Sequence, residues 1–396
     1  MVARFLIGRK DAILELAGSK GAIWLAAAFV MTAALARRYD QADLLAKPHV
    51  LLLPLVVSGV NASLLALYWR LLRNGRGRPR FLVEWRRVVT LFWMTAPLAW
   101  LYGIPWERML DPVGAVWANV WSLLIVAAWR VILTARVLSV LGGISMTRCF
   151  AFLMVFADAV AVVLMALAPK PMVSLMGGIA HSPADALIAE LDVQIMIVGI
   201  LTFPVWLGFA LWALFAAAPR WTAVPQGRIH RNSWLAVAVV TVVFVVPMIW
   251  TQPEQRLATT VNRLLAEERA TEAIDLVSAH QPADLPPGFD PRPRHWTGEN
   301  SPRLWSVIVA LGERPDTPDW VKELWYRKLR LELEAPRWVS SDRESEDLAA
   351  GARALANDSE GLRIMKEFLD ETSHEGKIAE AFRAALGVER GEAGAE

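Results

Sequence analysis

The sequence predicts an all-α membrane protein, in which a polytopic bundle of about seven transmembrane helices precedes a C-terminal soluble helical domain. Apolar stretches long enough to cross a bilayer recur through the first 251 of the 396 residues. Hydrophobic residues make up 55% of the chain, and the mean hydropathy is +0.36, which is high for a soluble protein. From Gln252 onward the chain becomes charged and carries helical periodicity instead.

The distribution of charge separates the same two regions. Residues 1–251 contain 22 Lys and Arg against 11 Asp and Glu, whereas residues 252–396 contain 19 against 28. The first region therefore carries a formal charge of +11 and the second −9, which indicates two different environments. An acidic C-terminal region argues against nucleic acid as a partner, because phosphate binding needs a basic surface.

Seven segments match the roughly 20 apolar residues that a helix needs to cross about 30 Å of hydrocarbon. The predicted spans are Gly21–Ala36, Val50–Leu72, Val88–Ile104, Val113–Thr134, Cys149–Ala168, Val193–Ala218 and Ser233–Trp250. The predicted domains are a lead at 1–20, a membrane domain at 21–251, a helical domain at 252–387 and a disordered tail at 388–396. The lead either lies as an amphipathic helix on the membrane surface or is disordered.

Basic residues fall mainly on alternate loops. We count 17 Lys and Arg on the side of the N-terminus and 5 on the opposite side, so the positive-inside rule predicts a cytoplasmic N-terminus. An odd number of spans then places the C-terminal domain outside. Arg37 and Arg38 do not fit this pattern, and the Ala34-Leu35-Ala36 spacing leaves open a cleaved signal peptide. Cleavage would leave six spans, with the C-terminal domain still outside.

Asp158 is predicted to lie midway along the fifth span, where a carboxylate costs on the order of 2.5–3.5 kcal/mol on insertion scales. The carboxyl group can stay protonated or pair with a cation, and Arg130 in the fourth span is the best candidate partner. One interpretation makes Asp158 a proton or cation site. The other makes it a polar contact between helices, with small neighbours Ala157 and Ala161 that let another helix approach.

The predicted outer loop from Lys170 to Asp192 contains four groups that bind metal ions in other proteins. These groups are His181, Asp185, Glu190 and Asp192. They are either weak candidates for a divalent metal site or part of a solvated acidic loop. The sequence contains no nucleotide-binding, zinc-protease or nucleophile-elbow motif, so we expect no cofactor and identify no catalytic residue.

The C-terminal region has helical periodicity interrupted by a proline-rich connection at 282–302. Helices are predicted at about 254–266, 269–280, 303–312, 318–334, 343–356, 360–371 and 375–386. Leu264–Leu276 has the pattern of a tetratricopeptide helix junction, but it amounts to about one partial unit, and a stable array needs at least three. A small irregular helical domain is the other interpretation.

Two further parts of the sequence resemble a known group of proteins. These parts are Arg9–Ile13 together with Ala36–Leu45, and the segment from Leu264 through Arg292. They resemble a group of uncharacterised bacterial multi-spanning membrane proteins. The resemblance implies a bacterial inner-membrane location, and it implies no activity, substrate or functional residue.

The sequence leads to three hypotheses about function. The first is a non-catalytic integral membrane protein whose partners are the lipid bilayer and a protein bound through 252–387, or whose external domain acts as a sensor. The second is a small-molecule or ion transporter that uses Asp158. The third is a membrane enzyme that acts on lipid or cell-wall intermediates at the outer face.

Overall fold

The structure is a computed structural model that describes residues 1–72, 79–167, 183–215, 222–287, 289, 304–334, 342–371 and 377–388. All regular elements in these ranges are helices, so the predicted all-α class is confirmed. The chain divides into two compact units. Met1–Pro169 with Leu187–Pro253 form the membrane unit, and Glu254–Glu396 with Lys170–Ala186 form the C-terminal unit.

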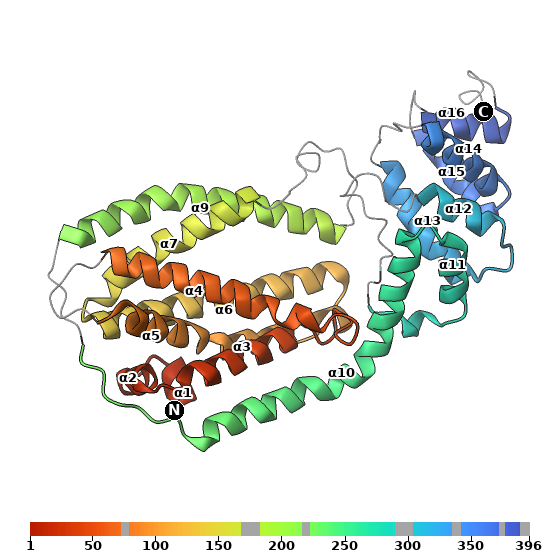
Figure 1. Cartoon of the computed structure of the whole chain (residues 1–396). Helices are drawn as coiled ribbons and strands as arrows, with labels where there is room; N and C mark the ends of the chain where they lie inside the picture. The colour runs from red at the N-terminus through yellow and green to blue at the C-terminus, as the bar shows by residue number, and fades with distance from the viewer. Residues whose placement is uncertain are drawn as a thin grey trace. The chain divides into compact units, whose positions relative to one another are not determined.

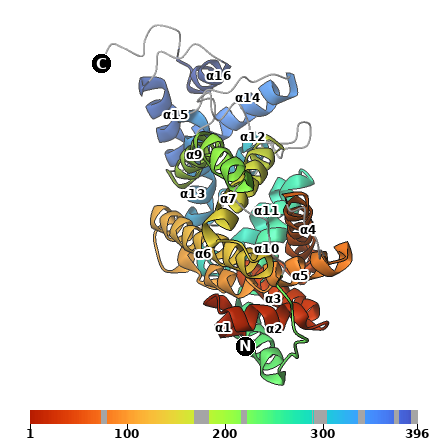
Figure 2. The same ribbon diagram turned by 90° about the vertical axis from the view of Figure 1, so that its left-hand side faces the viewer.

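The membrane unit contains long antiparallel helices that run alongside one another (Figure 1) and are seen nearly end-on in Figure 2. In chain order its elements are α1 (Val2–Leu6), α2 (Lys10–Gly18), α3 (Ala22–Arg38), η1 (Pro48–Leu51), α4 (Leu53–Leu72), α5 (Phe81–Trp93), η2 (Ala96–Gly103), η3 (Trp106–Arg108), α6 (Pro112–Gly142), α7 (Met146–Leu167), α9 (Pro183–Phe215) and α10 (Arg231–Ala266). Six segments are long and apolar enough to cross a membrane, and the pair α2 and α3, bent by 109°, would be a seventh. These helices indicate a membrane protein.

Helix α3 is short but runs between the same two ends of the unit as the longer helices. Its 17 residues correspond to about 25 Å at 1.5 Å per residue. At its C-terminal end, the Tyr39 hydroxyl donates a hydrogen bond of 3.0 Å to the carbonyl of Gly103, at the end of η2. At its N-terminal end, a Cβ added to Gly21 would lie 3.3 Å from Ile229, which precedes α10. The apolar segment predicted as the first span therefore lies parallel to α10.

Gln252 joins the C-terminal end of α3 to α10 through three hydrogen bonds. Its amide nitrogen donates to the carbonyls of Tyr39 and Ala42 at 3.1 and 3.0 Å, and its amide oxygen accepts from the Leu44 backbone at 2.8 Å. The side chain is 5% exposed. Thr251 adds a bond of 2.7 Å to the Tyr39 carbonyl. We call this group the Gln252 clasp. It satisfies backbone groups that the end of a helix leaves without partners.

At the opposite end, residues 222–230 form a connector that leads into α10 and packs against α2. A Cβ added to Gly18 would lie 1.8 Å from the Pro225 carbonyl oxygen, and one added to Gly227 would lie 1.7 Å from the Glu15 carbonyl oxygen. The two backbones therefore approach so closely that only glycine fits at either position. His230 Nε2 lies 3.3 Å from Glu15 Oε1 at the same contact.

Prolines affect the predicted spans in different ways. The third span changes from α-helix to 3₁₀-helix after Trp93, with Pro97 in the first turn of η2, whereas Pro54 lies in the first turn of α4 and does not interrupt it. Pro204 and Pro247 lie inside continuous helices. The prediction of separate helices on either side of Pro253 is wrong, because α10 continues through it. A proline removes one helix hydrogen bond, which a long helix with intact flanking turns tolerates.

The C-terminal unit has its own hydrophobic core. Its elements, after the last turns of α10, are α11 (Ala270–Ser278), η4 (Pro282–Asp284), α12 (Leu304–Gly312), α13 (Asp319–Glu334), α14 (Asp342–Ala356), α15 (Ser359–Glu371) and α16 (Lys377–Leu386). Trp325 and Phe382 are fully buried in this core, together with Val261 from α10. Arg330 links α13 to Glu360 of α15 by an ion pair. The predicted helices of this region agree with these elements, while the predicted tail at 388–396 lies almost entirely outside the described residues.

Candidate functional site

Asp158 lies on α7, and its carboxylate is buried against α9. The side chain is 8% exposed, and its Oδ2 lies 3.1 Å from the hydroxyl oxygen of Thr202. The same hydroxyl lies 2.8 Å from the carbonyl of Val198, one turn earlier on α9. Phe150 and Trp206 also join the two helices, with ring centroids 5.5 Å apart. Asp158 is therefore part of the contact between α7 and α9.

Arg130 does not contact Asp158 in this structure. Its Nε donates a hydrogen bond of 3.1 Å to the hydroxyl of Thr95, which follows α5. Its guanidinium carbon lies 5.1 Å from the centroid of the Phe92 ring, a cation–π geometry. Among the described residues, Asp158 is thus bonded to a hydroxyl instead of the predicted cation, and Arg130 is stabilised by an alcohol and an aromatic face.

A second buried carboxylate, Glu84, lies in the first turn of α5. Glu84 is 3% exposed, and its Oε2 is 2.8 Å from the guanidinium of Arg70 in the last turn of α4. The pair joins the last turn of α4 to the first turn of α5, with the Glu84 end buried and the Arg70 end partly exposed. The sequence does not single out Glu84. It lies in residues 81–87, which are predicted to end a basic loop just before the span that begins at Val88.

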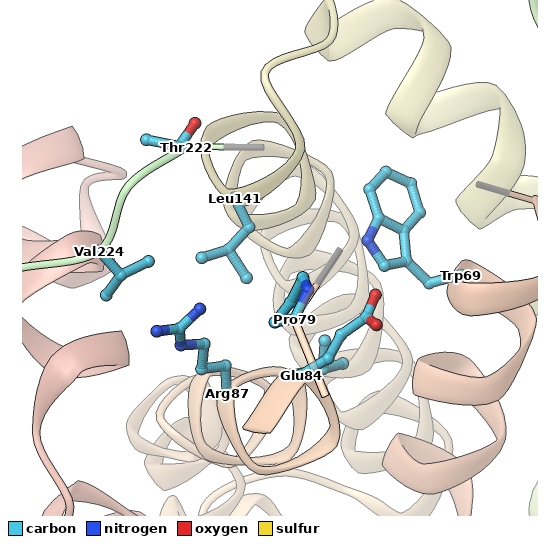
Figure 3. Close-up of a pocket in the computed structure, with 8 residues that line it drawn as sticks. Trp69, Pro79, Glu84, Arg87, Leu141, Thr222 and Val224 are labelled. Carbon is cyan, nitrogen blue, oxygen red and sulfur yellow. The ribbon is translucent and has the colours of Figure 1, made fainter. Parts of the chain in front are cut away.

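Beside this ion pair lies a cavity of about 10 Å³, lined by Glu84 and Arg87 of α5, Leu141 of α6 and Thr222 and Val224 of the connector, among others. Figure 3 shows the Glu84 carboxylate on the side of Trp69, whereas the Arg87 guanidinium points toward Leu141 and Val224. Arg87 Nε is buried and has no hydrogen-bond partner among the described residues. The cavity is large enough for about one water molecule, which could accept this bond, and too small for a substrate.

The connector closes this cavity from the outside. The Thr222 hydroxyl donates a hydrogen bond of 2.8 Å to the carbonyl of Val140. The Thr222 amide donates one of 3.4 Å to the carbonyl of Leu141. Both acceptors lie in the last turns of α6, where helix carbonyls lack internal partners. These two bonds join the connector to the C-terminal end of α6 beside the cavity.

Three of the four candidate metal ligands of the predicted outer loop lie, wholly or by their side chains, outside the described residues. His181 lies outside the described residues, and so do the side chains of Asp185 and Asp192. Glu190 is exposed on α9 and accepts a bond of 2.9 Å from the Gln194 amide. Within the described part of the chain, no group of three or more His, Cys, Asp or Glu side chains is placed to hold a metal ion.

No family model, no curated protein and no solved structure matches this chain. The function of the protein therefore has to be inferred from the arrangement of its own polar groups. Of the buried carboxylates in the described part of the membrane unit, Glu84 and Asp158 each join a pair of helices.

Proposed function

We propose that this protein is a non-catalytic integral membrane protein that presents its C-terminal unit to a protein partner or as a sensor. The observation that carries the proposal is the separate core of that unit, in which Trp325, Leu329 and Phe382 are fully buried.

We propose further that the membrane is the inner membrane of a bacterium, with the N-terminus in the cytoplasm and the C-terminal unit outside. The excess of Lys and Arg at the end of the unit that carries the N-terminus supports this orientation. The position of α3 between the same two ends as α10 supports an odd number of crossings. Topology reporters fused at Asn74 and at Glu396 test it, because the two reporters should give opposite signals. Equal signals would overturn the orientation.

Site-specific photocrosslinking tests the binding of a partner. A photoreactive residue is placed in the full chain at exposed positions of the C-terminal unit, Lys366 and Glu380, and at Leu201 on α9 as a control. We expect a discrete crosslinked protein from at least one position of the C-terminal unit that is absent from Leu201. Crosslinks to lipid alone from every position would contradict a protein partner.

A specific observation also favours a second function, proton-coupled transport at Asp158. The Thr202 hydroxyl has one hydrogen, so it cannot donate to Asp158 at 3.1 Å and to the Val198 carbonyl at 2.8 Å at once. A protonated Asp158 resolves this conflict, because it donates to Thr202 while Thr202 donates to Val198. Pro204 lies two residues further along α9, where it removes one backbone hydrogen bond from the continuous helix beside Asp158.

Proton flux into liposomes that contain the purified protein tests this second function. Asp158→Asn keeps a donor and an acceptor at the position but cannot exchange a proton, so flux should fall to the level of empty liposomes. Asn61→Asp, a carboxylate added to α4, controls for a nonspecific effect of intramembrane charge. Flux that is equal in wild type, Asp158→Asn and empty liposomes would leave the contact between α7 and α9 as the role of Asp158.

A further inference from the structure

A groove of about 560 Å³ runs along the outer surface of the membrane unit between α4 and α5. Val56, Val60 and Leu64 line it from α4, and Phe81, Trp85 and Trp93 line it from α5. Val56 and Val60 are 60% and 56% exposed, so the groove opens to whatever surrounds the unit. Between candidate spans, that surrounding medium is lipid or a second protein helix.

Two polar side chains of the groove have partners, whereas the buried Trp93 Nε1 has none among the described residues. Trp85 Nε1 donates a hydrogen bond of 2.9 Å to the Ser63 hydroxyl, and the Ser63 hydroxyl donates one of 2.7 Å to the carbonyl of Gly59. Gly59 also lets the Trp93 ring approach, since an added Cβ would lie 3.3 Å from it. An apolar chain can therefore lie over Trp85 and Ser63 without depriving either side chain of its hydrogen bond.

The length of the groove matches one leaflet of a bilayer. It extends along α4 from Leu55 to Leu67, which is about 18 Å at 1.5 Å per residue. Half of the hydrocarbon thickness of about 30 Å is about 15 Å. A single acyl chain that enters from one membrane surface would follow the groove over most of its length.

Positive charge gathers at the end of the groove where α5 begins. Arg80 precedes Phe81 and is exposed, and the Arg70 guanidinium carbon lies 5.3 Å from the centroid of the Phe81 ring. The Arg70 guanidinium is paired with Glu84 in the first turn of α5, so Arg80 supplies the exposed positive charge at this end of the groove. The residues that line the groove include no acidic side chain.

From this geometry we propose that the groove binds an anionic phospholipid, with one acyl chain between α4 and α5 and the phosphate beside Arg80. Basic sites between transmembrane helices bind anionic headgroups by this combination of charge and apolar surface. A second copy of the chain fits less well, because two such grooves would bring their exposed Arg80 side chains together.

Native mass spectrometry of the full chain in neutral detergent tests the proposal. The probes are phosphatidylglycerol and phosphatidylcholine with identical acyl chains, titrated over the same range. We expect one phosphatidylglycerol to bind in preference to phosphatidylcholine. Arg80→Gln should weaken phosphatidylglycerol binding by about fivefold, since one arginine near the surface contributes about 1 kcal/mol, and should leave phosphatidylcholine binding unchanged. Arg231→Gln, another exposed arginine at the start of α10, is the matched control.

A second variant separates the groove from the charge. Val60→Trp fills the groove from an exposed position and should abolish the preferred binding, whereas Val198→Trp on the exposed face of α9 should not. Equal binding of both lipids, or full binding to Val60→Trp, would overturn the proposal. A dimer mass that Val60→Trp converts to a monomer would also overturn it, because the groove would then be an interface between copies.

Discussion

The two units of this chain use large apolar side chains in opposite ways. In the membrane unit they are exposed along α4, α6, α9 and α10, with Leu201 at 66% and Trp212 at 63%. In the described residues of the C-terminal unit no large apolar side chain is exposed, while Trp325 is 0% exposed. Trp212 therefore faces outward in the membrane unit, whereas Trp325 forms part of the core of the C-terminal unit. The placement of large apolar side chains therefore suits one unit to lipid and the other to water.

The largest expected effect comes from truncating the same side chain in both units. Trp325→Ala should destabilise the C-terminal unit by about 3–5 kcal/mol, because it removes a fully buried ring and leaves a cavity. Trp212→Ala should have little effect, because an exposed side chain in lipid loses no burial. Hydrogen exchange of the full chain in micelles, read by region, measures both. Equal loss of protection from hydrogen exchange in the two variants would contradict the different roles of tryptophan in the two units.

Introducing a charge tests the same contrast in the other direction. Val198→Arg, on the exposed apolar face of α9, should cost about 2.5–3.5 kcal/mol on insertion, since an arginine would then face hydrocarbon. Ala349→Arg, at an exposed position of α14, should stay within about 0.5 kcal/mol, because it faces water. The fraction of protein that resists alkaline extraction from membranes reports insertion. Normal insertion of Val198→Arg would show that this face of α9 is shielded from lipid.

The Gln252 clasp provides an intermediate effect. Gln252→Met keeps the size of the side chain but leaves the carbonyls of Tyr39 and Ala42 and the Leu44 amide without this partner, and a buried unsatisfied group costs about 1–3 kcal/mol. We expect faster hydrogen exchange at residues 39–44 and a lower melting temperature in micelles. Gln194→Met is the control, because Gln194 is exposed on α9. Unchanged exchange would mean that water replaces the amide at no cost.

The smallest expected effect is a pH dependence in the C-terminal unit. Burial raises the pKa of Asp358, but hydrogen bonds from the Gly361 amide and the Tyr326 hydroxyl, together with Lys322, outweigh it and lower the pKa below the ordinary 3.8. The charged form is therefore favoured by folding. The contribution of Asp358 to the free energy of unfolding is complete above its ordinary pKa of 3.8. This contribution is lost as the pH falls through the lower pKa that Asp358 has in the folded state.

Asp358→Asn removes this titration and retains a residue that can cap the N-terminus of α15. The difference in unfolding free energy between wild type and variant should narrow as the pH falls from about 6 to about 3. Urea denaturation of the full chain in micelles, followed by hydrogen exchange at α15, measures it. Asp370→Asn, at an exposed position near the end of α15, controls for a general effect of charge. A constant difference across this range would rule out Asp358 as the titrating group.

Much of the fold was predictable because it depends on local patterns. Apolar length identified the long helices, and helical periodicity identified α13 to α16. The 3₁₀ turn of η2 and the continuous path of α10 through Pro253 were not predicted. Proline marks a place where a helix loses one hydrogen bond, but the packing around it decides whether the helix ends there.

The polar contacts were less predictable, because they depend on residues far apart in the chain. Asp158 stands out in the sequence as an acid within an apolar stretch, but its hydrogen-bond partner, Thr202, is 44 residues away and is uncharged. Opposite charge makes Arg130 the predicted partner of Asp158, but Arg130 is hydrogen-bonded to Thr95. Glu84 was overlooked because its neighbours are basic, and only the packing of α4 against α5 buries it with Arg70.

The Gln252 clasp also has a mechanical consequence. Gln252 is the penultimate residue of the membrane unit, and its amide holds three backbone groups in the turn after α3. Rotation of α10 about its long axis would have to break all three bonds together. Gln252 and Thr251 therefore hold the rotational position of α10 within the membrane unit, and torque applied to this part of α10 would be transmitted to the turn at residues 39–44.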